Sequence, residues 1–283
     1  MSILLSADGV RYRYADASVG LSECTLHIER GTKNALLGAN GSGKTTLLQH
    51  FNGLLKPEGG EIRFAGEPLN YRRAALHALR SRVGMVFQNP DRQLFSANVS
   101  EDISFGPLNL GLDPATVHQR VTDALHMVGL QDLADRPVHH LSYGQKKRVC
   151  LAGVLAMQPE VLLLDEPMAG LDAGMQHDLL ALLDQLAAQG ITIVLSTHDV
   201  DFAYRWADRL HLLAGGRCLA SFAASDLPQH STSLAQAGHQ LPQVFAWHAR
   251  LAEYGLCPGP LTARSLAQLL EQLPPAALRG THS

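Results

Sequence analysis

The start of the chain alternates between apolar and polar positions. The alternation runs over residues 3–14 and again over 24–28, and a polar stretch at 16–20 separates the two. A period of two places every second side chain on the same face, which is typical of strands with one buried face. We therefore expect two short strands joined by a turn.

Four short apolar runs follow, and each ends abruptly in polar residues. They cover residues 34–37, 82–87, 161–164 and 191–195. Three of these runs look like strands buried on both faces, as in a parallel sheet that helices cover. The pattern predicts the core strands of the fold.

Helical periodicity appears between these runs. Asp113 precedes a proline and is a predicted helix cap, as is Asp172. The predicted helices cover residues 43–51, 114–128, 143–157 and 173–188. Alternating strands and helices predict an α/β fold. The stretch from about 89 to 158 shows helices and no strand, so we expect a helical subdomain there.

The composition changes after Leu227 to glutamine, histidine, serine and proline. This change predicts a linker, followed by two short helices near 244–254 and 262–273. We expect a main domain over residues 1–225, and a linker with a small helical region over 226–283.

Composition and charge then narrow the class of protein. The 283 residues are 46% hydrophobic with a net charge of −3, which favours a folded chain and gives no reason to expect a nucleic-acid partner. The longest apolar run, 149–157, is too short to span a membrane, and the first residues do not resemble a secretion signal. The four cysteines and fourteen histidines show no metal-binding spacing, so we expect free thiols.

Residues 38–45 read GANGSGKT, directly after a predicted strand and at the start of a predicted helix. In such a loop backbone N–H groups wrap a phosphate, Lys44 reaches the outer phosphates and the Thr45 hydroxyl coordinates magnesium. The predicted nucleotide-binding residues here are Gly38, Ala39, Asn40, Gly41, Ser42, Gly43, Lys44, Thr45 and Thr46.

Polar side chains follow the other predicted strands. Residues 161–167 read VLLLDEP, so Asp165 and Glu166 end one strand, with Asp165 facing the magnesium ion and Glu166 the attacking water. Gln88 and His198 end two more strands. Ligands of open α/β sheets bind outside the carboxyl ends of the strands, so we expect these residues to meet there, with His198 at the γ-phosphate.

Residues 141–148 read LSYGQKKR before a predicted helix. Ser142 and Gln145 have the spacing of a capping box, which explains both residues without a function. The same helix start, with Lys146, Lys147 and Arg148 beside it, is also suited to an anion. Helix propensity alone leaves both interpretations open.

LSYGQ resembles the LSGGQ signature of the ATP-binding cassette (ABC) family, and it precedes VLLLDEP by about 20 residues as in that family. The resemblance, over residues 3–225, implies a P-loop NTPase cassette with a mostly parallel core sheet, an antiparallel β subdomain, a helical subdomain and a small C-terminal helical extension. Tyr143 and Met168 depart from the common pattern. The roles that the resemblance implies are adenine stacking by Tyr14, γ-phosphate contacts by Ser142, Gly144 and Gln145, a Q-loop glutamine at Gln88 that also binds magnesium, a D-loop ending at Asp172, and a switch histidine at His198.

A narrower resemblance follows Gln88. The stretch QNPDRQLF, with VSEDISFGPLNLGL after it, resembles ATPases of energy-coupling factor (ECF) transporters, and the tail resembles their cobalt-importing members. It implies an ATPase that energises metal-ion import, with nickel or a vitamin as alternative cargo. A soluble, non-transport cassette that acts on DNA or ribosomes and a nucleotide sensor without catalysis are the alternatives from other classes.

The family mechanism implies partners. ATP would lie between the P-loop of one subunit and the Ser142–Gln145 segment of another, so the resemblance implies a homodimer or a heterodimer with a similar ATPase. Glu166, His198, Lys44 and Gln88 would act in catalysis, with Mg²⁺ held by Thr45, Gln88 and Asp165. A transmembrane energy-coupling subunit and a substrate-binding membrane subunit would complete the importer, with this chain peripheral on the cytoplasmic face of the cell membrane.

Overall fold

The computed structural model describes residues 2–257 and 259–273, and it contains two sheets. The six-stranded sheet has the order β10-β9-β3-β8-β7-β6, parallel throughout except at the β9–β10 pair. Its strands are β3 (Lys33–Leu37), β6 (Val83–Val86), β7 (Val161–Leu164), β8 (Thr192–Thr197), β9 (Arg209–Ala214) and β10 (Arg217–Ala223). The predicted α/β cassette with a mostly parallel core sheet is confirmed.

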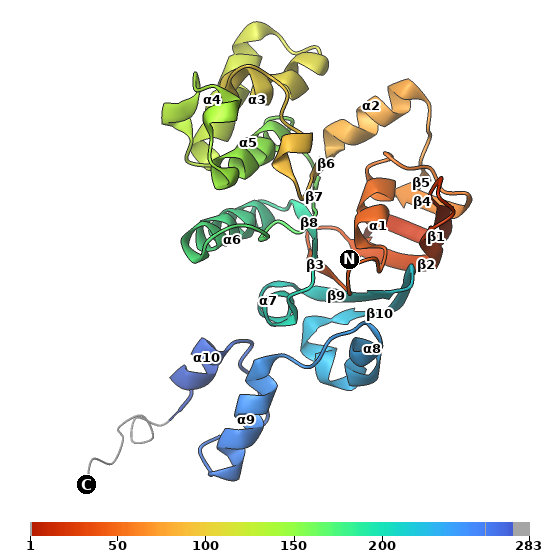
Figure 1. Cartoon of the computed structure of the whole chain (residues 1–283), viewed down its shortest axis with the longest axis vertical. Coiled ribbons are helices and arrows are strands. Elements are labelled where there is room, and N and C mark those ends of the chain that lie inside the picture. The colour runs from red at the N-terminus through yellow and green to blue at the C-terminus, as the bar shows by residue number, and fades with distance from the viewer. Residues whose placement is uncertain (1, 258, 274–283) are drawn as a thin grey trace.

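The second sheet is antiparallel and has the order β2-β1-β4-β5. Its strands are β1 (Ile3–Arg13), β2 (Val19–Glu29), β4 (Gly59–Phe64) and β5 (Glu67–Pro68). Together with helix α1 (Lys44–Phe51), this sheet covers one side of the six-stranded sheet (Figure 1). The two strands predicted from alternation are β1 and β2.

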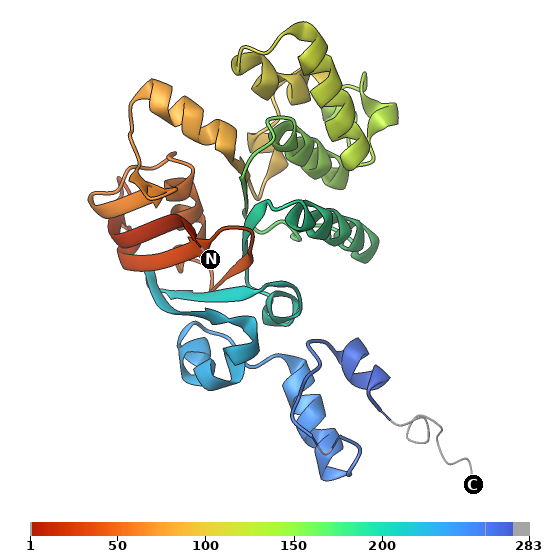
Figure 2. The same ribbon diagram turned by 180° about the vertical axis from the view of Figure 1, so that it is seen from behind.

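Helices cover the other side of the core sheet, as the view from behind also shows (Figure 2). Helices α5 (Tyr143–Leu155), α6 (Ala173–Ala188) and α7 (Val200–Trp206) lie there. Side chains along β7 alternate between the two sides: Leu162 and Leu164 enter the helical core, and Leu163 the core beside α1. This double burial explains why the strand sequence is uninterrupted.

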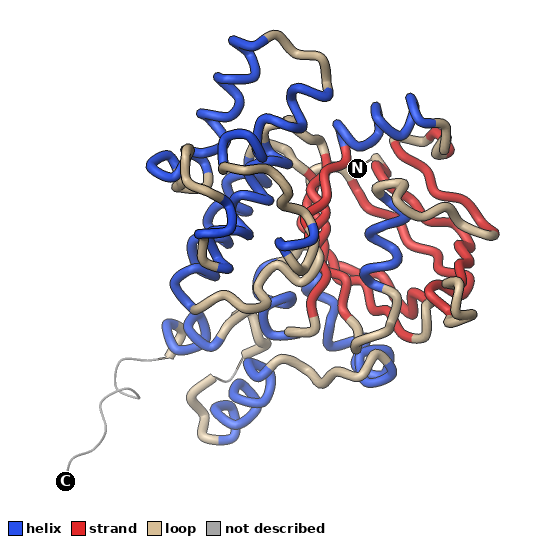
Figure 3. Tube along the Cα trace, turned by 45° about the horizontal axis from the view of Figure 1, so that its top comes forward, coloured by secondary structure: helices blue, strands red, loops and turns tan. Residues whose placement is uncertain are grey.

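The stretch between β6 and β7 is helical, as expected. It contains α3 (Val99–Asn109), α4 (Pro114–Met127) and α5, with short 3₁₀ turns at Pro90–Arg92, Gln131–Leu133 and Val138–His140. Asp113 caps α4 by accepting bonds from the N–H groups of the first turn. Colouring by secondary structure separates this helical region from the strands (Figure 3).

The region after Leu227 differs from the expected linker. A 3₁₀ segment (Ala224–His230) and helix α8 (Ser231–Gln236) come first, and Leu227, Leu234 and Ala237 are buried in the main core. These three apolar residues are widely spaced within a polar stretch, so the sequence pattern did not predict that they are buried. The two predicted tail helices are α9 (Gln243–Glu253) and α10 (Leu266–Glu271).

Two further helices, α2 (Arg73–Arg82) and α7, were not predicted from the sequence. On α2, Leu79 is buried and Leu76 is partly buried against the same core, so its apolar face is short. Within residues 2–257 and 259–273, the length and apolar character needed to cross a membrane occur together in no helix.

Candidate active site

The loop between β3 and α1 has a backbone that requires glycine. Gly41 and Gly43 have φ angles of 80° and 106°, which side chains other than glycine rarely adopt. A Cβ on Gly38 would lie 2.3 Å from the carbonyl oxygen of Leu213. Because Gly43 also offers no capping side chain, the N–H groups at the start of α1 are available to an anion.

Lys44 is the first residue of α1, and its side chain binds back to this loop. Its Nζ donates hydrogen bonds to the carbonyl oxygens of Gly38 (2.6 Å) and Ala39 (3.2 Å), and it lies 3.9 Å from Oε1 of Glu166. Burial lowers the pKa of Lys44, while the neighbouring carboxylates act in the opposite direction. Beside it, the buried Ser42 hydroxyl has no hydrogen-bond partner in the described chain, as expected for a group that meets a phosphate.

Asp165 joins three elements at the end of β7. It is buried and accepts hydrogen bonds from the Thr45 hydroxyl, at 3.0 and 2.9 Å, and from the Ser196 hydroxyl at 2.7 Å. Carboxylate and hydroxyl oxygens are the ligands that Mg²⁺ prefers, so this donor set fits a magnesium ion.

Glu166 binds a different partner through its carboxylate than Asp165 does. Its Oε2 lies 3.1 Å from Nδ1 of His198, and its side chain is 13% exposed. Its backbone adopts the left-handed φ of 44°. Strained backbone of this kind persists where the surrounding structure holds it, often at functional sites.

Ser196 was missed by the sequence analysis. Its hydroxyl donates to Asp165 and accepts from the Glu166 N–H at 2.9 Å, so one side chain of β8 holds both neighbouring acidic residues. Its place two residues before His198, at the end of a predicted strand, was the only available signal.

A cleft of about 510 Å³ joins the P-loop to the other strand ends. Tyr14 forms one wall, and its hydroxyl lies 2.8 Å from that of Thr46. Of the predicted site residues, those that line the cleft are Tyr14, Asn40, Gly41, Ser42, Gly43, Lys44, Thr45, Thr46, Gln88, Glu166 and His198.

Seven predicted residues do not line this cleft: Gly38, Ala39, Asp165, Ser142, Gly144, Gln145 and Asp172. The first three contact lining residues directly, because Gly38 and Ala39 accept from Lys44 and Asp165 accepts from Thr45. Ser142 and Gln145 form the predicted capping box, because the Ser142 N–H donates to Gln145 Oε1 (2.9 Å) and the Gln145 N–H to Ser142 Oγ (3.3 Å). Asp172 caps α6 by accepting from the N–H of Met175 at 2.8 Å. Within this chain, the capping interpretation of the signature segment holds.

Comparisons with known proteins agree with this geometry. The family model for ABC transporters matches residues 21–169. The cobalt import ATP-binding protein CbiO of Rhodobacter capsulatus is 47% identical over 244 residues, covering 86% of this chain and 87% of CbiO. The ECF transporter ATP-binding protein EcfA of Methanocaldococcus jannaschii is 44% identical over 233 residues, covering 82% and 84%.

Solved structures give the same result. CbiO1 of Clostridium perfringens, described as part of the ABC transporter complex cbiONQ, superposes with a TM-score of 0.75 at 38% identity, covering 90% of this chain and 99% of CbiO1. The dimeric cassette MJ0796, bound to ADP and Pi, gives a TM-score of 0.70 at 26% identity, covering 78% and 99%. The chain therefore belongs to the ABC transporter family and is an ATPase coupled to transport, similar to the ATP-binding proteins of ECF transporters.

Proposed function

We propose that this chain hydrolyses ATP to energise an importer of divalent metal ions, with cobalt as the first candidate. The observation that carries the proposal is the meeting of Lys44, Glu166 and His198 with the Gln88 strand end in one cleft. The cobalt assignment draws on the named function of CbiO, which shares 47% of its residues with this chain over the matched region.

Each residue of the cleft would have its own role in ATP hydrolysis. Lys44 would bind the outer phosphates, and Glu166 would orient the attacking water or accept its proton. His198 hydrogen-bonds to Glu166 and would contact the γ-phosphate. Magnesium held by Thr45, Asp165 and Gln88 would neutralise charge that develops on the phosphates.

The second half of the ATP site would come from another subunit. Ser142, Gly144 and Gln145 lie outside the cleft of their own chain, so they can meet a nucleotide only across an interface. The dimeric state of the cassette MJ0796 supports this arrangement. We infer a homodimer or a heterodimer with a similar ATPase, in which Tyr14 stacks on adenine and Asp172 lies near the partner's site.

An exposed aromatic surface beside the Q-loop would receive the membrane partner. We define it by Phe95 (64% exposed), Phe105 (50%) and Leu108 (55%); the two phenylalanine rings pack edge to face at 4.6 Å. It continues from the loop that carries Gln88 onto α3. An apolar helix face of the transmembrane subunit fits this surface, which would place the chain on the cytoplasmic face of the membrane.

Substitution of this surface tests the membrane partner. Phe95→Glu should release the chain from membranes while leaving its ATP affinity within about twofold, because Phe95 does not line the nucleotide cleft. Trp247→Glu is the matched control, since Trp247 is also exposed (53%) but lies on α9. Equal membrane retention of Phe95→Glu and wild type would contradict the assigned surface.

Uptake measurements test the function itself. Cells that lack this protein should lose cobalt uptake, wild-type protein should restore it, and Glu166→Gln should not restore it. Nickel and a vitamin are measured in parallel, and loss of either one instead of cobalt would correct the cargo. If uptake of all three is unchanged, the transport role is wrong.

We also propose that residues 1–225 form the ATPase domain, with 89–158 as its helical subdomain and 226–283 as an appended region. Leu227 and Leu234 are buried in the same core cluster as the helices of the proposed ATPase domain, which supports direct packing between the two regions.

A further inference from the structure

Lys147, on α5, is a buried lysine that binds the loop after β7. Its side chain is almost fully buried, at 7% exposed. Its ammonium donates to the carbonyl oxygens of Glu166 (3.3 Å), Pro167 (2.9 Å) and Ala169 (2.6 Å). Among residues 2–257 and 259–273, no carboxylate lies within ion-pair distance of it.

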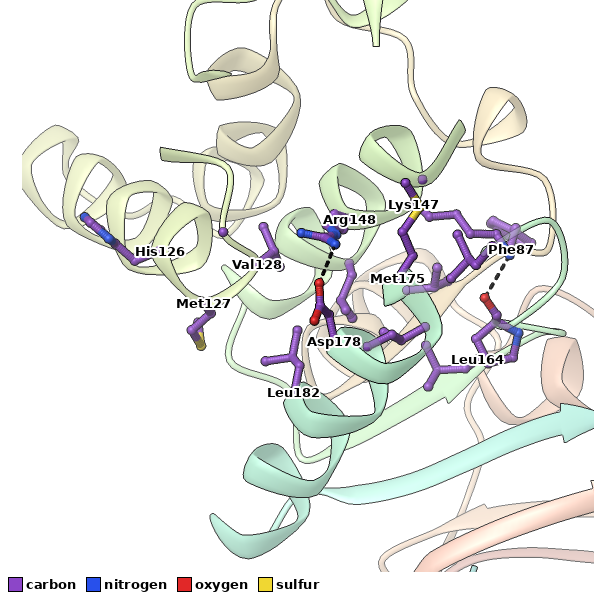
Figure 4. A pocket seen from close by; sticks show the side chains of 17 residues that line it. Phe87, His126, Met127, Val128, Lys147, Arg148, Leu164, Met175, Asp178 and Leu182 are labelled. Carbon is purple, nitrogen blue, oxygen red and sulfur yellow. Dashed lines mark hydrogen bonds and ion pairs between the residues drawn. The ribbon is translucent and has the colours of Figure 1, made fainter. Parts of the chain in front are cut away.

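The surroundings make this charge costly to keep. Lys147 lines a mostly apolar cavity of about 280 Å³ between α5 and α6, together with Phe87, Leu171 and Met175 (Figure 4). Burial lowers the pKa of Lys147 to about 8. Burying an ammonium group away from water is costly unless hydrogen bonds and nearby carboxylates compensate it, and here the three carbonyl groups and the charges of Glu166 and Asp165 do so.

The loop that Lys147 binds needs external support. Glu166 has a φ of 44°, a conformation that costs about 1–3 kcal/mol for a residue other than glycine. The three carbonyl groups held by Lys147 all lie within four residues of the loop. Their positions therefore fix the direction in which the Glu166 side chain leaves the strand.

Tyr143, one turn earlier on the same helix, connects α5 to the loops that carry Gln88 and Gly170. Its hydroxyl donates to the carbonyl oxygen of Gln88 at 3.1 Å, and its ring lies 5.3 Å from the Lys147 ammonium. A Cβ on Gly170 would lie 2.7 Å from the ring. The start of α5 thus contacts both the loop after β6 and the loop after β7.

We propose that Lys147 is a positioning residue for ATP hydrolysis, whose ammonium holds loop 166–169 so that the Glu166 carboxylate faces the bound nucleotide. The inference rests on the proposed role of Glu166. Because Ser142 caps the helix that carries Lys147, this contact couples the position of α5 to the Glu166 carboxylate of the same chain.

Substitution of Lys147 tests the proposal in the full-length protein. Lys147→Met should lower kcat by about tenfold or more, because small displacements of a reacting group are costly, while KM and ATP affinity stay within about twofold. Lys147→Gln retains an amide donor and should recover most of kcat. Lys33→Met is the matched control, since Lys33 is a half-buried lysine paired with Asp184 at the opposite end of the sheet.

The outcomes separate this inference from the role of Glu166. If Lys147→Met keeps kcat within twofold of wild type, or if Lys147→Gln loses kcat, ATP affinity and thermal stability together, the positioning role is wrong. In a Glu166→Gln background, Lys147→Met should lower the residual rate by less than about twofold, because both changes act on one group. Full turnover in Glu166→Gln alone would instead remove the proposed role of Glu166.

Discussion

The charged side chains at the two ends of the six-stranded sheet have different kinds of partner. At the amino end of the parallel strands, Glu160 accepts hydrogen bonds from Arg30 and Arg82, and Lys33 pairs with Asp184 at 3.0 Å. Each charge therefore faces an opposite charge, partly exposed to solvent. These contacts link the sheet to α6 and to the antiparallel sheet.

At the carboxyl end, Lys44 and Lys147 are buried and donate mainly to backbone carbonyls. Glu166 is strained, and the Ser42 hydroxyl has no partner among the described residues. Groups of this kind are retained where a ligand completes them. The comparison predicts that substitutions at the carboxyl end change activity or ATP binding, with or without a loss of stability, and that those at the amino end change stability alone.

The largest effect is expected for Glu166→Gln. This variant keeps the size of the side chain but cannot accept a proton, so we expect kcat to fall by about 10³-fold. ATP affinity should remain within a few fold, since the substitution leaves Lys44 and the P-loop intact. Steady-state ATPase assays and nucleotide titration measure the two quantities, and unchanged turnover would contradict the comparison.

Lys44→Ala should act on binding. Loss of charge-assisted hydrogen bonds to phosphate should weaken ATP affinity by about 10- to 100-fold. Lys56→Ala is the control, because Lys56 lies over the Tyr71 ring and away from the cleft. Calorimetry that finds equal ATP affinity for both variants would remove Lys44 from the site.

Ser196→Ala should reduce both activity and stability. It removes the hydroxyl that contacts Asp165 and the Glu166 N–H, leaving a buried group without its partner at a cost of about 1–3 kcal/mol. We also expect kcat to fall by about tenfold. Ser81→Ala, on the exposed surface of α2, should change neither quantity. Wild-type kcat in Ser196→Ala would show that the Ser196 contacts do not position the acidic residues.

Glu160→Gln should give the smallest effect, about 1 kcal/mol in the free energy of unfolding. Hydrogen bonds from Arg82, then Arg30, lower the pKa of Glu160 below its usual 4.5. The contribution of the carboxylate is therefore present above pH 4.5 and lost as the pH falls through the lowered value. Denaturation at pH 7 and at lower pH should show wild type and variant converging on acidification. If the difference in unfolding free energy between wild type and Glu160→Gln is the same at both pH values, the ionic role of Glu160 is wrong.

Much of the fold follows from local pattern. The buried strand β7 and the helix α6 with its Asp172 cap were predicted because apolar runs and caps are local signals. Helix α2 and the buried segment near Leu234 were not, since α2 buries one leucine and relies on Arg80 bonding to the Gly53 carbonyl. Tertiary contacts stabilise these two segments, whose sequences carry only weak local signals.

The site residues, too, could be predicted only in part from the sequence. Gln88, Glu166 and His198 could be placed together because parallel strands bring their carboxyl ends to one edge. Ser196 and Lys147 could not, because their partners depend on strand register and on how α5 packs against the loop after β7. Neither relation is visible in residue spacing.

The most direct test compares two carboxylates at opposite ends of the same sheet. ATPase activity and unfolding free energy are measured side by side for Glu166→Gln and Glu160→Gln. The account predicts loss of turnover by about 10³-fold with little loss of stability in the first, and near wild-type turnover with about 1 kcal/mol lost in the second. Equal turnover in the two variants would contradict the assignment of catalysis to the carboxyl end.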